Sequence, residues 1–346
     1  MLKILFLLLC AFDIPNIILG SNSDESESES GELELEPAKD NPLSHENLLY
    51  KSIIAFPYDE PVFIAYFYGR TYEERLEMIK NFRKKYGDDG FNKLKDKLKG
   101  VPETLRIVVP TVYYDARLLN LALQNRDNDW LMEVMVSRTS QEIREIKKTY
   151  EQKWNNNLCK AIDRNNIGDF ERILLALCAA DRDESDVVDE KLADSDCFKL
   201  YEYGPATIAG TNEEGINGIL FKRNYKQLRR MFEKFSDYEY STSLEKRTIE
   251  TMIDEEYSFC SKAALLKYVQ AVKSLPEFFA SSLKKSLTES NEKKLIRIIM
   301  SRAGVDLPEI AEAFGGKEEL SEQIAISAFT SSFTRNALRS FIRVNG

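Results

Sequence analysis

The sequence of 346 residues holds a single histidine, His45. A site built from several histidines, whether for a metal ion or for acid–base catalysis, is therefore excluded. The glycine-rich phosphate-binding loops GxxxxGK[S/T] and GxGxxG are also absent. His45 has no accompanying nucleophile elbow or glycine-rich oxyanion loop, so nothing supports a Cys or Ser nucleophile beside it. These absences predict a protein that is not an enzyme.

Basic residues are fewer than acidic ones, 48 against 57, which gives a formal net charge of −9. Most of the excess lies in residues 21–42, where serine alternates with glutamate and prolines close the segment. Such a composition cannot bury enough apolar surface to fold, so we expect a disordered acidic tail. The rest of the chain is nearly neutral. It lacks the excess of positive charge that binds the phosphates of DNA or RNA, and we expect no nucleic-acid partner.

Long apolar runs are missing, apart from a short one near the first residue. Lys3 precedes an almost wholly apolar run over 4–12, and small residues follow at Gly20 and Ser21. One positive charge, a short apolar core and a small-residue cleavage point are typical of a secretory signal peptide, which we assign to 1–20. The run is too short to cross a membrane, which takes about 20 residues. A buried N-terminal helix is the alternative, and an extracellular location is the expectation.

Cysteine is scarce as well, with five in the chain. Cys10 falls within the predicted signal peptide, and the spacings of Cys159, Cys178, Cys197 and Cys260 fit no zinc template. In a secreted protein these four could pair as disulfides. The apolar helical surroundings of Cys159 and Cys178 are equally typical of buried free thiols. The sequence leaves their pairing open.

What the sequence does contain is a hidden repeat. Four short strings that each end in an arginine align with one another, at 66–70, 134–138, 219–223 and 298–302. Counted from that arginine, positions −7, −3, +8 and +12 are apolar or aromatic in all four strings, in step with a helical period of 3.6 residues. The arginines lie 68, 85 and 79 residues apart. We therefore predict four repeats of about 70 residues, with a longer link before the third.

Each repeat is predicted to consist of about five short helices, because no segment shows the sustained alternation of a β-strand. An apolar helix ends near the arginine, and a break such as Arg138-Thr139-Ser140 begins the next helix with a Thr or Ser cap. Gly100 and Gly168 each open a further apolar helix. The repeated apolar positions should form the core. Each repeated arginine is expected to bond helix-terminal carbonyls inside its own repeat.

With these repeats the body of the chain resembles the annexin family. Segments 137–146 and 295–310 read like that family's second and fourth repeats, Gly210-Thr211-Asn212-Glu213 like the start of a third repeat, and 272–276 like its end. The resemblance covers about residues 46–345. It implies an all-α fold in which four five-helix repeats form a curved disk. The repeats would span 46–112, 113–180, 196–274 and 276–345.

The resemblance also implies a function. Annexins bind calcium at loops of the type G-x-G-T, completed by a later acidic side chain, and through calcium they dock to anionic phospholipid. Glycines let backbone carbonyls turn outward as oxygen ligands, while one carboxylate supplies charge. In three repeats the loop lacks these glycines and the acidic place holds another residue: Ala55-Phe56-Pro57-Tyr58 with Lys97, Leu123-Gln124-Asn125-Arg126 with Asn165, and Leu287-Thr288-Glu289-Ser290 with Phe329. Loop acids such as Asp59, Asp127 and Asp129 remain available for a minor ion.

The third repeat keeps more of the pattern, although Ile208 occupies the place of the first glycine. The resemblance assigns one weak calcium site here, with the predicted metal ligands Gly204, Gly210, Thr211 and Glu256. An insertion blurs the register, so Glu250 and Glu255 are alternatives for the carboxylate. A capped helix start at Thr211, followed by Glu213, is the alternative interpretation of the whole motif.

The predicted function is calcium-dependent binding to anionic phospholipid by a secreted protein that associates peripherally with membranes. The alternative is a calcium-independent secreted interaction, structural or effector protein. Such a protein would keep only the fold and would bind a protein partner or assemble with itself. Binding to liposomes in calcium and in chelator separates the two.

Overall fold

The computed structural model describes residues 49–51, 72–100, 111–165, 168–204, 212–237, 247–303, 305–330 and 332–345. Helices, joined by turns and links, account for these residues, and none of them lies in a strand. The predicted all-α class is thereby confirmed. The predicted signal peptide, the acidic tail and much of the predicted first repeat lie outside the described residues.

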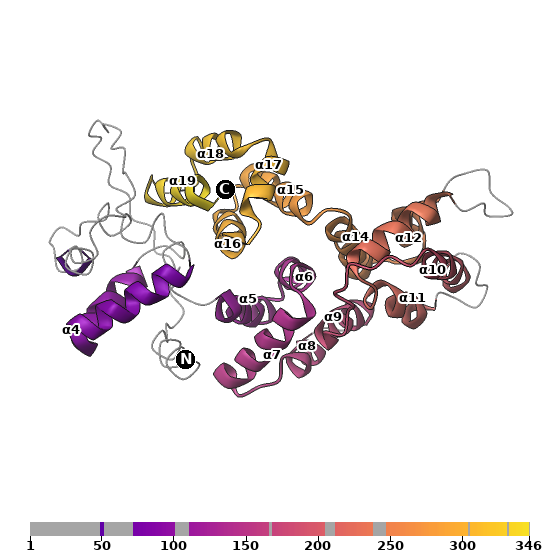
Figure 1. The fold of residues 1–346 in the computed structure, drawn as a ribbon, viewed down its shortest axis with the longest axis horizontal. Helices are drawn as coiled ribbons and strands as arrows, with labels where there is room; N and C mark the ends of the chain where they lie inside the picture. Colours follow the sequence, from indigo (N-terminus) through magenta and orange to yellow (C-terminus); the bar gives the residue numbers. More distant parts are fainter. Residues whose placement is uncertain are drawn as a thin grey trace. The chain divides into compact units, whose positions relative to one another are not determined.

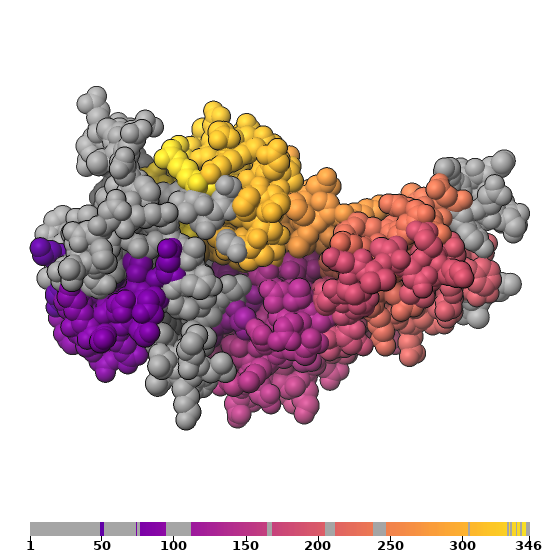
Figure 2. All heavy atoms as spheres, in the orientation of Figure 1, coloured from indigo at the N-terminus to yellow at the C-terminus, as the bar shows by residue number. Residues whose placement is uncertain are grey.

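The chain forms two compact units. Unit 2 spans 111–282 and unit 1 comprises 1–110 with 283–346. Unit 2 holds α5 (Thr111–Asn125), α6 (Asn128–Ser137), α7 (Ser140–Trp154), α8 (Leu158–Asn165), α9 (Asp169–Ala179), α10 (Glu190–Tyr203), α11 (Glu213–Leu220), α12 (Tyr225–Asp237), α13 (Ile249–Glu256) and α14 (Phe259–Lys273), coloured magenta to orange in Figure 1. In the space-filling view these helices form one continuous packed body (Figure 2).

Unit 1 holds α4 (Tyr72–Gly100), α16 (Glu292–Arg302), α17 (Leu307–Phe314), α18 (Lys317–Ala325) and α19 (Ser332–Asn345), while α15 (Leu275–Thr288) crosses the boundary between the units. The long helix α4 is two helices that meet at Gly87, whose φ of 63° lies in the left-handed region that favours glycine. Near this kink Tyr50 stacks on Tyr86, with ring centroids 4.2 Å apart.

The start of each of several helices is fixed by a side-chain cap. Asp127, Asn212 and Asn291 occupy the same place in three predicted repeats, and each accepts a backbone amide at 3.0 Å in the first turn of α6, α11 or α16. Thr139 and Glu142 form a reciprocal capping box at the start of α7. The predicted Thr cap after Arg138 is therefore confirmed.

The repeated apolar positions form the core. Every described member of the set is buried: Met78, Phe82, Leu131, Met135, Ile146, Tyr150, Ile216, Leu220, Met231, Phe235, Leu295, Ile299, Ile310 and Phe314. Helices that bring these side chains inward at a 3.6-residue period can pack against one another without strands. This confirms the core predicted from the periodicity.

The repeated arginines have acidic partners that the sequence pattern did not indicate. Arg138 donates to the two carboxylate oxygens of Asp115 at 2.6 and 3.1 Å. Arg223 makes the same paired contact with Asp196 at 2.7 and 3.2 Å. In the fourth string the partner lies one turn downstream, where Arg302 donates to the Asp306 carboxylate at 2.6 and 2.7 Å. In these paired contacts the acceptors are carboxylates, where helix-terminal carbonyls were expected.

The cysteine pairing that the sequence left open is resolved. Cys159 of α8 and Cys178 of α9 form a disulfide that links these neighbouring helices, with 6.2 Å between their Cα atoms. Cys197 is a buried free thiol and Cys260 is an exposed one.

The longer link before the third repeat is irregular but well anchored. Residues 180–189 contain no helix. The Arg182 guanidinium lies over the Tyr225 ring, 4.2 Å from its centroid, and donates to the Tyr225 hydroxyl at 2.8 Å. The Asp183 amide donates to the Lys222 carbonyl at 2.9 Å. The link is therefore attached to the α11–α12 junction of the third repeat.

Candidate functional site

The predicted third-repeat site lies where α10 ends and α13 ends. Gly204 is the residue directly after α10, and Glu256 is the last residue of α13. A Cβ placed on Gly204 would lie 3.5 Å from Cγ of Glu256 and 3.4 Å from the carbonyl oxygen of Leu200. The structure thus brings two of the four predicted ligands together. The other two, Gly210 and Thr211, lie outside the described residues.

The alternative carboxylates are engaged elsewhere. Glu250 forms an ion pair with Lys273, and Glu255 lies 3.2 Å from the Arg247 guanidinium. Since it is Glu256 that approaches Gly204, Glu256 is the better candidate for the acidic ligand.

Negative charge gathers next to this carboxylate, around Tyr257. The Tyr257 side chain is buried, and its hydroxyl has no hydrogen-bond partner within the part of the chain that the structure describes. Burial raises the pKa of the Tyr257 phenol, and the carboxylates of Glu213, Asp169 and Glu256 raise it further. Three acids from different helices therefore act on one buried phenol.

Two of these acids, Asp169 and Glu213, share one arginine. Arg172 donates to Glu213 at 2.7 Å and to Asp169 at 3.4 Å. Burial raises the pKa of Glu213, and the neighbouring Asp169 carboxyl raises it as well, although Arg172 opposes this. One cation for two carboxyls leaves a local excess of negative charge, which favours a further cation nearby.

Carboxylates alone do not make the site. Within the described ranges, no three His, Cys, Asp or Glu side chains gather closely enough to hold a metal ion. Calcium at Glu256 would therefore depend on backbone carbonyls for its remaining oxygen ligands, as a glycine-bearing loop permits.

The acids proposed for a minor ion in the second repeat have structural roles. Asp127 caps α6 by accepting the Trp130 amide at 3.0 Å. Asp129 forms an ion pair with Lys267. Asp59, the corresponding acid of the first repeat, lies outside the described residues.

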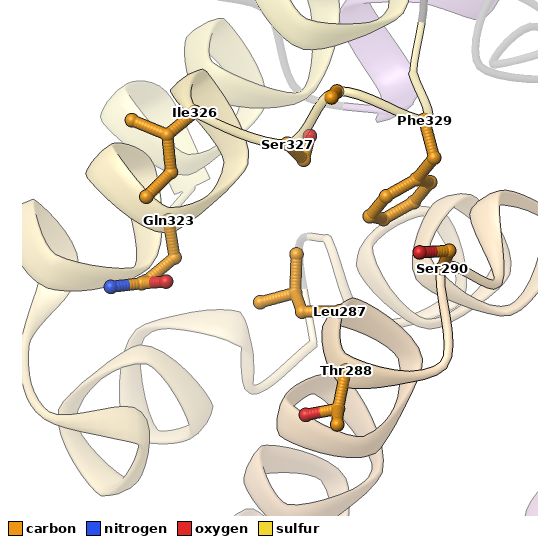
Figure 3. A pocket seen from close by; sticks show the side chains of 8 residues that line it. Leu287, Thr288, Ser290, Gln323, Ile326, Ser327 and Phe329 are labelled. Carbon is orange, nitrogen blue, oxygen red and sulfur yellow. The ribbon is translucent and has the colours of Figure 1, made fainter.

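In the fourth repeat the loop 287–290 and Phe329, which the repeat pattern pairs, do meet in space. Together they border a hollow of about 570 Å³ whose lining residues are Leu287, Thr288, Ser290, Gln323, Ile326, Ser327, Ala328 and Phe329. Figure 3 shows Gln323 and Ile326 on one side of the hollow and Ser290 with Phe329 on the other. The lining offers apolar groups, hydroxyls and an amide, and it includes no carboxylate.

Comparison with known proteins identifies the family of the chain. The family model described as Annexin matches residues 114–177. Annexin A13 of Mus musculus is 33% identical over 296 residues, which cover 84% of this chain and 91% of that relative. The chain belongs to the annexin family. Annexin A7 of Macaca fascicularis is 30% identical over 301 residues, and this annexin spans 60% of the length of that relative.

Solved annexin structures share the fold. Annexin III superposes with a TM-score of 0.79 at 27% identity, over 89% of this chain and 96% of that one. Chicken annexin V in complex with Zn²⁺ gives 0.73 at 28% identity, over 89% and 96% of the two chains. Calcium-bound annexin (Sm)1, at 20% identity and a TM-score of 0.71 over 86% of this chain and 89% of that one, supports the fold alone. The predicted repeated all-α annexin fold is confirmed.

Membership of the family supports a general function. Annexins as a family bind phospholipid in a calcium-dependent manner and are in general non-enzymatic membrane-binding proteins. Among the helices of this annexin that the structure describes, none has the length and hydropathy needed to span a bilayer.

Proposed function

We propose that this annexin binds anionic phospholipid membranes in the presence of calcium through one weak site in its third repeat, and that it is not an enzyme. The observation that carries the proposal is the approach of Glu256 to Gly204. A carboxylate beside a glycine-bearing loop can supply both charge and carbonyl oxygens to a hard cation. The ligands proposed are Gly204, Gly210, Thr211 and Glu256.

The other family-type sites are proposed to be lost. The fourth-repeat hollow is lined by apolar side chains, hydroxyls and an amide where a calcium site needs charged oxygens. In the second repeat, Asp127 and Asp129 are used as a helix cap and an ion pair. A single site with one carboxylate ligand supports weak affinity, because few charged oxygens hold the ion.

The experiment is pelleting with vesicles of phosphatidylserine and phosphatidylcholine, in calcium and in chelator. Glu256→Gln keeps the size of the side chain and removes its charge, so most calcium-dependent binding should be lost. Glu255→Gln is the matched control, because the adjacent carboxylate is ion-paired with Arg247, and it should bind as the wild type does. Equal binding by the wild type and Glu256→Gln would contradict the ligand assignment.

We also propose that the protein is secreted and associates with membranes from outside the cell. The N-terminal sequence 1–20 supports this, and so does the Cys159–Cys178 disulfide, because disulfides persist mainly in oxidising compartments. Protein from a eukaryotic secretory host should begin near Ser21 when sequenced from its N-terminus. Recovery of chains with an intact Met1 from the cytosol would refute the assignment.

A second candidate function is a calcium-independent interaction module that keeps only the fold and binds a protein or a second copy of itself. The fourth-repeat hollow favours it, since its apolar and hydroxyl lining suits a ligand that is not a cation. Vesicle binding that is absent in calcium and in chelator alike, together with concentration-dependent self-association, would support this function over the first.

A further inference from the structure

An arginine of the second repeat reaches the edge of the proposed third-repeat site. Arg172 lies on α9, and its guanidinium donates to Glu213, the first residue of α11, at 2.7 Å. The same guanidinium nitrogen lies 3.4 Å from the carboxylate of Asp169. Helices α9 and α11 are neighbours in the fold (Figure 1), so this contact joins two repeats through side chains that are 41 residues apart in the chain.

Glu213 lies close to the proposed calcium ligands. It follows Thr211 by two residues, so the Cα atoms of the two are within about 7 Å of each other. The Asn212 amide donates to the Tyr203 carbonyl at 2.7 Å, which brings the start of α11 back to the end of α10, where Gly204 lies. The Arg172 guanidinium, bound to Glu213, is therefore held at the rim of the proposed site.

Negative charge exceeds positive charge at this rim. Burial raises the pKa of the Tyr257 phenol, and three carboxylates raise it further: Glu213, Asp169 and Glu256. Two of these carboxylates share the charge of Arg172. A cation that enters the site therefore gains attraction from the carboxylates and meets repulsion from the guanidinium.

The contact between Arg172 and Glu213 is suited to tuning charge and contributes little to folding. The Arg172 side chain is 65% exposed and that of Glu213 is 26% exposed. An ion pair with one partner so exposed adds little to stability, because water already solvates the charge. The positive charge itself remains next to the site, where it affects any ion that binds.

We propose that Arg172 is a resident counter-ion of the third-repeat site and lowers its calcium affinity. The inference rests on the proposed function, because it requires calcium at Glu256. It goes further in giving control of that site to a residue of the neighbouring repeat, which acts through its charge and is not itself a ligand.

The first test measures the calcium concentration that gives half-maximal binding to vesicles of phosphatidylserine and phosphatidylcholine. Arg172→Gln should lower it about threefold to fivefold, because a unit charge about 10 Å from a divalent ion changes its binding by that factor in a medium as polarisable as water. Arg172→Lys keeps the charge and should bind as the wild type does. Arg230→Gln is the matched control and should change little, because its partner Glu190 begins α10, about 20 Å along the helix from Gly204.

A pair of neutral variants separates charge from structure. Glu213→Gln should raise the half-maximal calcium concentration, because the charge of Arg172 is then less compensated. The double variant Arg172→Gln/Glu213→Gln should return it close to the wild-type value. A contact kept only for folding would shift calcium binding in the same direction in both single variants, and that result would refute the inference. A double variant as weak as Glu213→Gln alone would make Glu213 a calcium ligand and overturn the assignment of Arg172.

A third measurement removes the lipid. Terbium(III) takes oxygen ligands as calcium does and is excited through nearby aromatic side chains, so its luminescence reports binding to the protein alone. Arg172→Gln should bind terbium more tightly than the wild type, and the difference should shrink in high salt, which screens exposed charges. A change that occurs with vesicles and not with terbium would show that Arg172 acts on the lipid, and it would overturn the proposal.

Failure of this inference can be told apart from failure of the proposed function. Calcium-dependent binding of the wild type that Glu256→Gln abolishes and Arg172→Gln leaves unchanged would overturn the inference alone. Vesicle and terbium binding that are absent from the wild type and from Arg172→Gln alike would refute both.

Discussion

Arg138 and Asp115 place a full ion pair in the core of the second repeat. Their side chains are 2% and 1% exposed. A buried pair of this kind is weak evidence of net stabilisation, because both charges lose their hydration. Removing one partner is strongly destabilising, because the other charge stays buried without compensation.

Arg138→Met should therefore lower the free energy of unfolding by about 3–5 kcal/mol, as measured by urea unfolding followed by circular dichroism. The double variant Arg138→Met/Asp115→Leu should recover most of the loss, because the uncompensated carboxylate is gone. Arg230→Met, which breaks an exposed ion pair with Glu190, should change little. A loss for Arg138→Met as small as that for Arg230→Met would show that Asp115 is not effectively desolvated.

The buried phenol of Tyr225 makes the free energy of unfolding depend on pH in the alkaline range. Burial raises the pKa of its phenol to about 12, although Arg182 opposes the shift, and the ordinary value is about 10. Between these values the folded state holds a proton that the unfolded state has released. The free energy of unfolding should therefore be fully retained below pH ~10 and fall as the pH rises from ~10 towards ~12.

Urea unfolding at a series of pH values would measure this slope. Tyr225→Phe should be less stable at neutral pH, because the hydroxyl donates to the Val136 carbonyl at 2.6 Å, but its stability should fall less steeply above pH ~10. An unchanged slope would assign the alkaline loss to other buried phenols such as Tyr268.

Single residues also show where inference from sequence succeeds. The core positions could be predicted, because a helical period that recurs in four repeats marks apolar side chains such as Met135 and Leu220 as inward-facing. The acceptors of the arginines could not. Asp115 and Asp196 lie more than five helical turns upstream of Arg138 and Arg223, and nothing local in the sequence marks them as partners.

At the scale of elements, two helices differ in how they begin. Thr139 caps α7 with a full capping box, whereas Ser258 precedes α14 without any side-chain cap bond. Thr139→Ala should lower the free energy of unfolding by about 1 kcal/mol, because two first-turn hydrogen bonds are lost. Ser258→Ala is the matched control and should lower it much less. Thermal unfolding of both variants measures the difference, and equal losses would contradict the role of the cap.

Element boundaries followed from sequence where a local signal existed. The break after Arg138 contains Thr139, a residue type that caps helices. Gly168 precedes α9 with a φ of 81°, a conformation that favours glycine. The disulfide had no such signal. Cys159 and Cys178 belong to different helices, and only the packing of α8 beside α9 brings them together.

At the scale of the whole molecule, the repeats and the family could be inferred, whereas the charged surroundings of the site could not. Gly204 and Glu256 could be proposed because the third repeat resembles that of the annexins, although an insertion shifts the place of the carboxylate. Asp169, which acts on the same buried Tyr257, comes from the second repeat. A pattern read within one repeat cannot reveal a side chain that a neighbouring repeat contributes.

The anchored link 180–189 has a consequence for how the second and third repeats open to solvent. The amide of Asp183 donates to the Lys222 carbonyl, and that of Asp189 donates to the Gln227 side chain at 2.7 Å. Amides held in this way exchange with deuterium only when their bonds break. Both should be protected nearly as well as amides inside α6 or α12, and Arg182→Ala should speed their exchange. The second and third repeats would then unfold as one cooperative unit, because the link 180–189 couples them.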